Sequence, residues 1–92
     1  MRKLIHVKAK HIRAGKPGIF GECAIALAAK DAGFPFPRVY SDELTFDHKE
    51  LIRYTTDLPR SARRFVKRFD KRKANCKPFR FFVDVDAEAV IL

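Results

Sequence analysis

The sequence has no tryptophan and only two cysteines, Cys23 and Cys76, too few for a disulfide framework in a chain of 92 residues. We therefore predict two free thiols and a cytoplasmic protein. No apolar run approaches the roughly 20 residues of a membrane-spanning helix. We also expect no signal peptide, because no apolar stretch follows Arg2 and Lys3. The length fits one domain, residues 1–92, with a core built largely from the nine phenylalanines.

Acidic residues are almost absent from one segment, residues 60–80. This segment has ten Lys or Arg residues and one acid, Asp70, so its net charge is +9. The rest of the chain has ten basic and ten acidic residues and is neutral. Like charges four residues apart on a helix repel each other, and a partner with many negative charges would relieve that repulsion. The alternative interpretation is a solvated helix face whose long side chains cover apolar surface.

The same segment has the periodicity of an amphipathic helix. Its apolar residues recur at spacings that place them on one helix face: Leu58, Ala62, Phe65, Val66 and Phe69. The opposite face is cationic: Arg60, Arg63, Arg64, Lys67, Arg68 and Lys71. We expect Asp57 to cap the start of this helix, Pro59 to lie in its first turn, and its end to fray across 73–75.

The other predicted elements are short strands and one more helix. They are strands at 3–10, 38–46, 51–56 and 77–85, and a helix at 22–32. Alternation slips near Ser41 and Asp42, where we expect a bulge or an extra turn. In the last strand the inward positions are predicted to be Phe79, Phe81, Val83 and Val85.

Residues 11–21 contain three glycines and a proline, and this composition predicts a loop. The Gly-x-x-Gly-x-x-Gly spacing does not match the dinucleotide-binding fingerprint. Backbone N–H groups of such a loop could approach an anion with help from Lys16. A plain connecting loop is the favoured interpretation.

The order of elements predicts the fold class. Strand, helix, two-strand hairpin, helix and strand (β-α-β-β-α-β) indicate an α+β domain with a mostly antiparallel sheet. We expect a ferredoxin-like arrangement, with both helices on one face of the sheet. The other face would be open, and it would carry Phe82 beside Arg80.

Three packing motifs extend over most of the chain. They are Cys-x-Ile-Ala-Leu-Ala at 23–28, a proline-initiated second helix that ends near Phe69 and Asp70, and Lys-Pro-Phe-x-Phe at 77–81. Together they resemble a family of small uncharacterised proteins from bacteriophage and bacterial genomes. The resemblance implies the extent of the domain and an intracellular, phage-related setting. It implies no catalytic residues, because the family has no established activity.

The cationic face predicts a protein that binds DNA or RNA. Arg60 and Lys71 lie about 16 Å apart along the helix, at about 1.5 Å per residue, which is long enough to engage several phosphates. Phosphate contacts set affinity without reading sequence, so we expect little sequence specificity. The candidate contact residues are Arg60, Arg63, Arg64, Lys67, Arg68, Lys71 and Arg80, with Lys16 and Phe82 as secondary candidates.

Two other binding modes stay open. The open sheet face could stack bases on Phe82 beside Arg80, as RNA-recognition domains do, although the paired motifs of those domains are missing. The protein could instead be a non-enzymatic phage accessory protein that docks on an acidic host protein, because charge alone does not separate that partner from nucleic acid.

An enzyme is the third class of function, for instance a small ribonuclease that uses His6, His11 or His48 as acid and base. These histidines are scattered over a strand, a loop and a turn. Cys23 and Cys76 lie 53 residues apart and there is no His-x-His pair, so we expect no metal site. We also predict no cofactor, no small-molecule substrate and no membrane partner.

Overall fold

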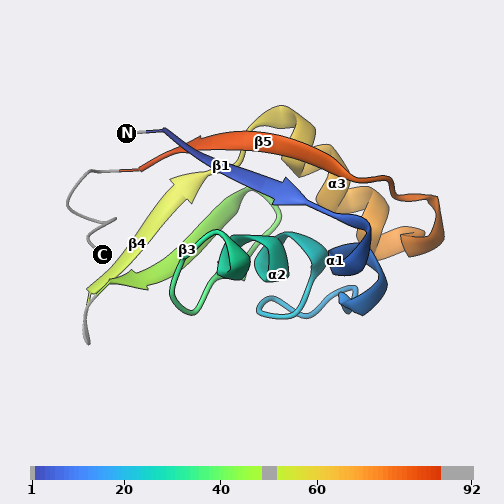
Figure 1. Ribbon diagram of the computed structural model, residues 1–92, viewed down its shortest axis with the longest axis horizontal. Helices are drawn as coiled ribbons and strands as arrows, with labels where there is room; N and C mark the ends of the chain where they lie inside the picture. The colour runs from blue at the N-terminus through green and yellow to red at the C-terminus, as the bar shows by residue number, and fades with distance from the viewer. Residues whose placement is uncertain (1, 49–51, 86–92) are drawn as a thin grey trace.

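The fold combines helices with antiparallel sheets, which confirms the predicted α+β class (Figure 1). The computed structural model describes residues 2–48 and 52–85. In chain order, the elements are β1 (Arg2–Val7), α1 (Ala9–Ala14), α2 (Ala24–Asp31), β2 (Arg38–Val39), β3 (Glu43–His48), β4 (Ile52–Asp57), α3 (Arg60–Lys71), the 3₁₀ turn η1 (Lys73–Asn75) and β5 (Phe79–Asp84). None of the described helices is long and apolar enough to cross a membrane.

The described strands form two sheets where one was predicted. β1 pairs with β5, from Arg2 opposite Asp84 to Val7 opposite Phe79. In the second sheet β3 lies between β2 and β4. A ferredoxin-like single sheet with both helices on one face is therefore not confirmed. The order of elements also differs from the predicted one, because it includes the additional helix α1 and the additional strand β2.

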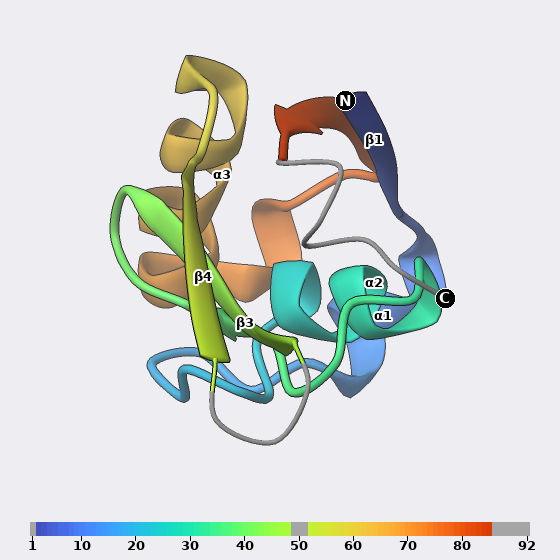
Figure 2. The same cartoon turned by 90° about the vertical axis from the view of Figure 1, so that its left-hand side faces the viewer.

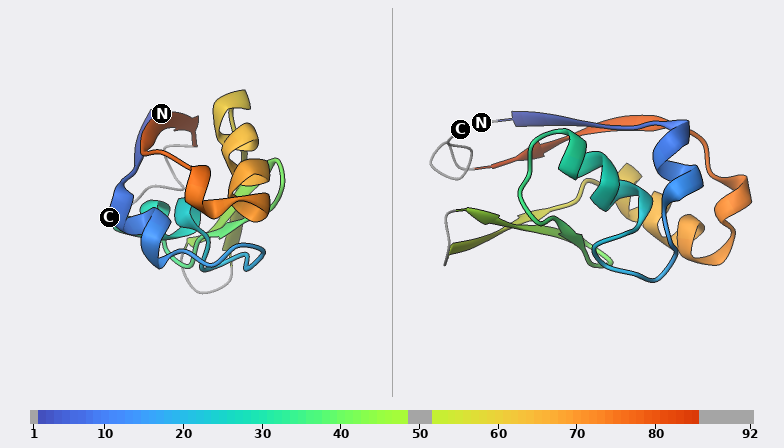
Figure 3. Two further views of the ribbon diagram at one scale, coloured as in Figure 1. Left: turned by 90° about the vertical axis from the view of Figure 1, so that its right-hand side faces the viewer. Right: turned by 60° about the horizontal axis from the view of Figure 1, so that its bottom comes forward.

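The burial of α2 accounts for the two sheets. Its buried residues are Ala24, Ile25, Ala26, Ala28 and Ala29. Figures 1 and 3 show α2 between the β1–β5 sheet and the β3–β4 hairpin. A helix buried on most of its circumference needs apolar neighbours on several sides. Ile5 and Phe81 of one sheet and Leu44 and Phe46 of the other belong to the same buried core cluster as α2.

Helix α1 replaces the end of the predicted strand 3–10 and the first part of the predicted loop 11–21. The Nδ1 atom of His11 accepts a hydrogen bond from the Lys8 backbone N–H at 2.9 Å and so caps the start of α1. Its Nε2 atom lies 2.7 Å from Asp31 Oδ2, which ties α1 to α2. At Gly15, a Cβ atom would lie 2.7 Å from the Ala24 backbone nitrogen, so only glycine allows this close approach.

The start of α3 differs from the prediction, whereas its apolar face agrees with it. Asp57 belongs to β4 and does not cap the helix, and the N-cap residue is Pro59, without a side-chain hydrogen bond. Leu58 donates its backbone N–H to Asp42 O at 2.9 Å, which holds the chain outside the helix until Arg60. Strand pairing is interrupted between β2 and β3, around Ser41, where a bulge or an extra turn was expected. The sequence also predicts a hairpin turn at 47–50, but residues 47 and 48 belong to β3, and residues 49–50 lie outside the described residues. The apolar tail at 87–92, expected to add a short strand or a docking segment, lies outside them too.

Candidate functional site

The apolar face of α3 determines which side of the helix reaches solvent. Ala62, Phe65 and Phe69 are buried, and the ring of Phe65 stacks on Phe79 of β5 with 4.7 Å between centroids. Figures 2 and 3 show α3 on the side of the molecule away from β1. The opposite helix face is exposed and carries Arg60, Arg63, Arg64, Lys67, Arg68 and Lys71.

Part of this exposed face is hollowed. The hollow has a volume of about 400 Å³, and we call it the cationic hollow; its lining residues are Arg64, Lys67, Arg68, Lys71, Arg72 and Asn75. Helix α3 ends at Lys71, and the backbone of Arg72 is no longer helical, with φ −145° and ψ 75°. Turn η1 then brings Asn75 to the hollow. Five cations therefore surround one depression, and none of the described residues in its lining is acidic.

The cations of the hollow are also unpaired among the residues that the structure describes. The salt bridges among the described residues are Lys10–Asp31, His11–Asp31, Lys16–Glu22 and Arg53–Asp47, and none of them includes a residue of the hollow. Asp70, the single acid of α3, accepts a hydrogen bond from the Gly18 backbone N–H at 3.0 Å instead of pairing with a cation. The positive charge of α3 is therefore not compensated within this part of the protein.

Five of the predicted contact residues do not line the cationic hollow: Arg60, Arg63, Arg80, Lys16 and Phe82. Arg60 is exposed in the first turn of α3. Arg63 folds back, and its Nε donates to Leu58 O at 2.8 Å. Lys16 lies 3.6 Å from Glu22, so its charge is paired. Arg80 is exposed on β5, opposite His6 in the β1–β5 ladder. Of the predicted contact residues, the structure thus brings Arg64, Lys67, Arg68 and Lys71 together at the hollow and places the others outside it.

Sequence reasoning missed Arg72 and Asn75 as members of the hollow. It predicted fraying at 73–75, whereas these residues form η1. The Lys73 ammonium group donates to Arg13 O at 2.7 Å and to Gly15 O at 2.8 Å. These contacts are between residues some 60 positions apart in the chain, so no local pattern predicts them.

The outer face of the β1–β5 sheet is a second surface with exposed cations. Phe82 is 48% exposed, and the Arg2 guanidinium lies 4.3 Å from its ring centroid in a cation–π contact. Leu4, the neighbour of Phe82 across the strands, is 41% exposed. The aromatic ring predicted as a stacking platform is thus solvent-accessible but already in contact with one cation.

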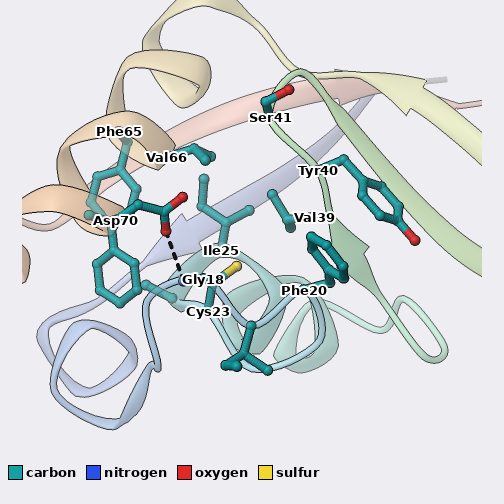
Figure 4. A pocket seen from close by; sticks show the side chains of 13 residues that line it. Gly18, Phe20, Cys23, Ile25, Val39, Tyr40, Ser41, Phe65, Val66 and Asp70 are labelled. Atoms are coloured by element: carbon teal, nitrogen blue, oxygen red, sulfur yellow. Dashed lines mark hydrogen bonds between the residues drawn. The ribbon is translucent and has the colours of Figure 1, made fainter.

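Sequence reasoning also missed an apolar pocket on the other flank of α3 (Figure 4). Its volume is about 340 Å³. We call it the apolar pocket, and its walls come from residues 18–20, from the start of α2, from residues 39–41 and from α3. The sequence does not reveal this pocket, because its lining residues come from four segments that only the tertiary fold brings together.

Both cysteines are free, as predicted. Burial raises the pKa of the Cys23 thiol, and the nearby Asp70 carboxylate adds to this effect. Burial also raises the pKa of the Cys76 thiol. Both side chains are thus neutral thiols near pH 7. Within residues 2–48 and 52–85, no group of three or more His, Cys, Asp or Glu side chains is placed to hold a metal ion.

Comparisons with known proteins give no match: no protein-family model, no curated protein and no solved structure matches this chain.

Proposed function

We propose that this protein binds nucleic acid through phosphate contacts made by the cationic hollow and the neighbouring exposed cations of α3. The observation that carries the proposal is the set of five cations around the hollow, none of which has an acidic partner among the described residues. Elsewhere in the described chain, Lys10, Lys16 and Arg53 do pair with acids. A row of phosphates would supply the missing negative charge.

The geometry of α3 suits a phosphate backbone. Its exposed cations follow the helix over about 16 Å, and Lys and Arg neutralise phosphates without reading bases. Asn75 is the one amide at the hollow, and an amide can contact a base edge. One such residue supports at most a small preference, so we expect binding to DNA and RNA with little sequence specificity.

A salt series tests the proposal. We expect binding to a labelled duplex at about 50 mM salt, with log K falling against log salt at a slope near −4.5 if five phosphates are contacted. Single-stranded DNA or RNA would give a slope near −3.5 for the same number of contacts. Absence of binding at low salt, or an affinity that does not depend on salt, would contradict the proposal.

Docking on an acidic protein surface is the alternative that the same charges support. Polyglutamate of matched length, titrated beside the nucleic acids, distinguishes the two partners. The nucleic-acid proposal predicts tighter binding to DNA or RNA and a high 260/280 nm absorbance ratio of the protein purified at low salt. Tighter binding to polyglutamate and a ratio typical of pure protein would favour the alternative.

A further inference from the structure

The apolar pocket takes no part in the proposed phosphate contacts, because none of its lining residues lines the cationic hollow. Phe20 and Tyr40 form one wall, with 4.8 Å between their ring centroids. Phe65 and Phe69 of α3 form the opposite wall, and Figure 4 shows Ile25 and Val39 between the two. Its volume of about 340 Å³ falls within the range of small-molecule sites, roughly 300 to 1,000 Å³.

The apolar residues beside this pocket are unusually exposed. Phe20 is 56% exposed and Ile19 is 45% exposed, although both line a pocket that also includes buried core residues such as Ile25, Val39 and Phe69. A ligand in the pocket would remove apolar surface of both side chains from water, which is favourable. The walls therefore suit a ligand with an apolar, ring-sized body.

Among the described residues, one charged side chain lines the pocket, and it is negative. Asp70 uses Oδ1 to accept the Gly18 N–H at 3.0 Å, and no cation pairs with its carboxylate among the described residues. Figure 4 shows this carboxylate turned toward Gly18 at the edge of the pocket. Among the described residues, no Lys or Arg lines the pocket, although the protein has a formal charge of +9. The pocket lining thus favours a positively charged ligand, whereas the cationic face of α3 favours a negatively charged one.

We infer that the apolar pocket binds a small organic cation, with a ring against Phe20 and Phe65 and an ammonium group beside Asp70. The free carboxylate oxygen can accept a charge-assisted hydrogen bond from the ammonium group. The aromatic walls also favour a cation over a neutral group. An anion of the same shape would be repelled by the Asp70 carboxylate, which costs free energy.

Three indole probes that differ in charge test this inference. Tryptamine, tryptophol and indole-3-acetate share a ring system and carry an ammonium, a hydroxyl and a carboxylate group. We expect tryptamine to give saturable NMR shifts at the backbone amides of Gly18, Phe20 and Ile25. Tryptophol should bind about tenfold more weakly, because it lacks the hydrogen bond between charged groups. Indole-3-acetate should bind more weakly still.

Two pairs of variants locate the contacts. Asp70→Asn keeps an oxygen for the Gly18 N–H and should lower the affinity for tryptamine about tenfold, to the level of tryptophol. Asp42→Asn makes the same change of net charge outside the pocket and should have no effect. Phe20→Ala should weaken all three probes, and Phe36→Ala, which removes a 74% exposed ring outside the pocket, should not.

Other outcomes would overturn the inference. Equal binding of tryptamine and tryptophol would show that the pocket accepts any apolar body, and shifts at other amides would place the site elsewhere. No binding of any probe by the folded protein would also overturn it. The proposed function is tested separately by nucleic-acid binding, which uses residues of the other flank of α3.

Discussion

The ring of Phe65 lies 4.7 Å from the ring of Phe79, with 30° between their planes, and this contact joins α3 to β5. Phe65 also stacks on Phe69, one turn further along the helix. Because these rings fix the rotation of α3, they decide which of its side chains face solvent. The surface proposed to bind phosphates thus depends on aromatic packing on the opposite side of the same helix.

Phe65→Ala should therefore lower the free energy of unfolding by about 3 to 5 kcal/mol, since it removes a buried ring and leaves a cavity. Phe82→Ala removes a ring that is 48% exposed and should cost much less. Urea unfolding of the two variants measures the difference. Equal losses of stability would show that α3 is not held by the Phe65 contacts.

Alanine substitution of Lys71 and of Lys73 should have different effects on stability and binding, although the two side chains carry the same charge. Lys73→Ala removes the ammonium group that binds Arg13 O and Gly15 O, so we expect a loss of about 1 to 2 kcal/mol of stability. Lys71→Ala should leave the melting temperature unchanged and weaken nucleic-acid binding, because Lys71 lines the cationic hollow. Melts and binding assays on both variants check this, and unaltered stability of Lys73→Ala would contradict the proposed anchoring of η1.

Gly15→Ala should destabilise the protein by about 3 kcal/mol, because overpacking forces the backbone to shift. The new Cβ would lie 2.7 Å from the Ala24 nitrogen and 2.8 Å from His11 O, both backbone atoms that cannot move alone. Gly21→Ala is the matched control, since its nearest contact would be an ordinary 3.8 Å. Similar unfolding midpoints for the two variants would disprove the close approach at Gly15.

The contacts of Asp31 predict a dependence of stability on pH. The hydrogen bond from His11 and that from Lys10 hold the pKa of the Asp31 carboxyl below its ordinary value of 3.8. As the pH falls, the unfolded state takes up the proton first, so this stabilisation is present above the ordinary pKa and is lost as the pH falls through the lowered one. Asp31→Asn should differ most from wild type at about pH 5 and less at about pH 2.5 in urea unfolding. A difference in unfolding free energy that is the same at both pH values would contradict the stabilising role of the Asp31 carboxylate.

The apolar face of α3 was predictable because its periodicity is local and its composition unambiguous. Phe65 and Phe69 are buried as expected, and so are Phe81 and Val83 in the last strand. Helix α1 was not predictable, since the glycine-rich sequence favours a loop and His11 is held by Asp31, 20 residues away. The two-sheet arrangement depends on how α2 packs between strands, which the order of elements does not specify.

The candidate site was predictable only in part for the same reason. Arg64, Lys67, Arg68 and Lys71 follow from the helical pattern, because they repeat along one exposed face. The remaining members of the hollow depend on the path of the chain after α3, which Lys73 determines through contacts with α1. The apolar pocket had no local signal at all.

The most direct test of the proposed function is charge reversal on the exposed face of α3. Arg64→Glu combined with Lys67→Glu should leave the melting temperature near that of wild type, because both side chains are exposed. Its control, Lys8→Glu combined with Lys30→Glu, lowers the net charge equally by changing two exposed lysines outside α3.

The deciding measurement is the salt dependence of duplex DNA binding by these two proteins. If five phosphates are contacted and two contacts are lost, the slope of log K against log salt should change from about −4.5 to about −2.7 for the α3 variant, with at least about tenfold weaker binding at low salt. The control should keep a slope near −4.5. A folded α3 variant that binds DNA like the control would contradict the account, and the contact surface would then lie elsewhere on the protein.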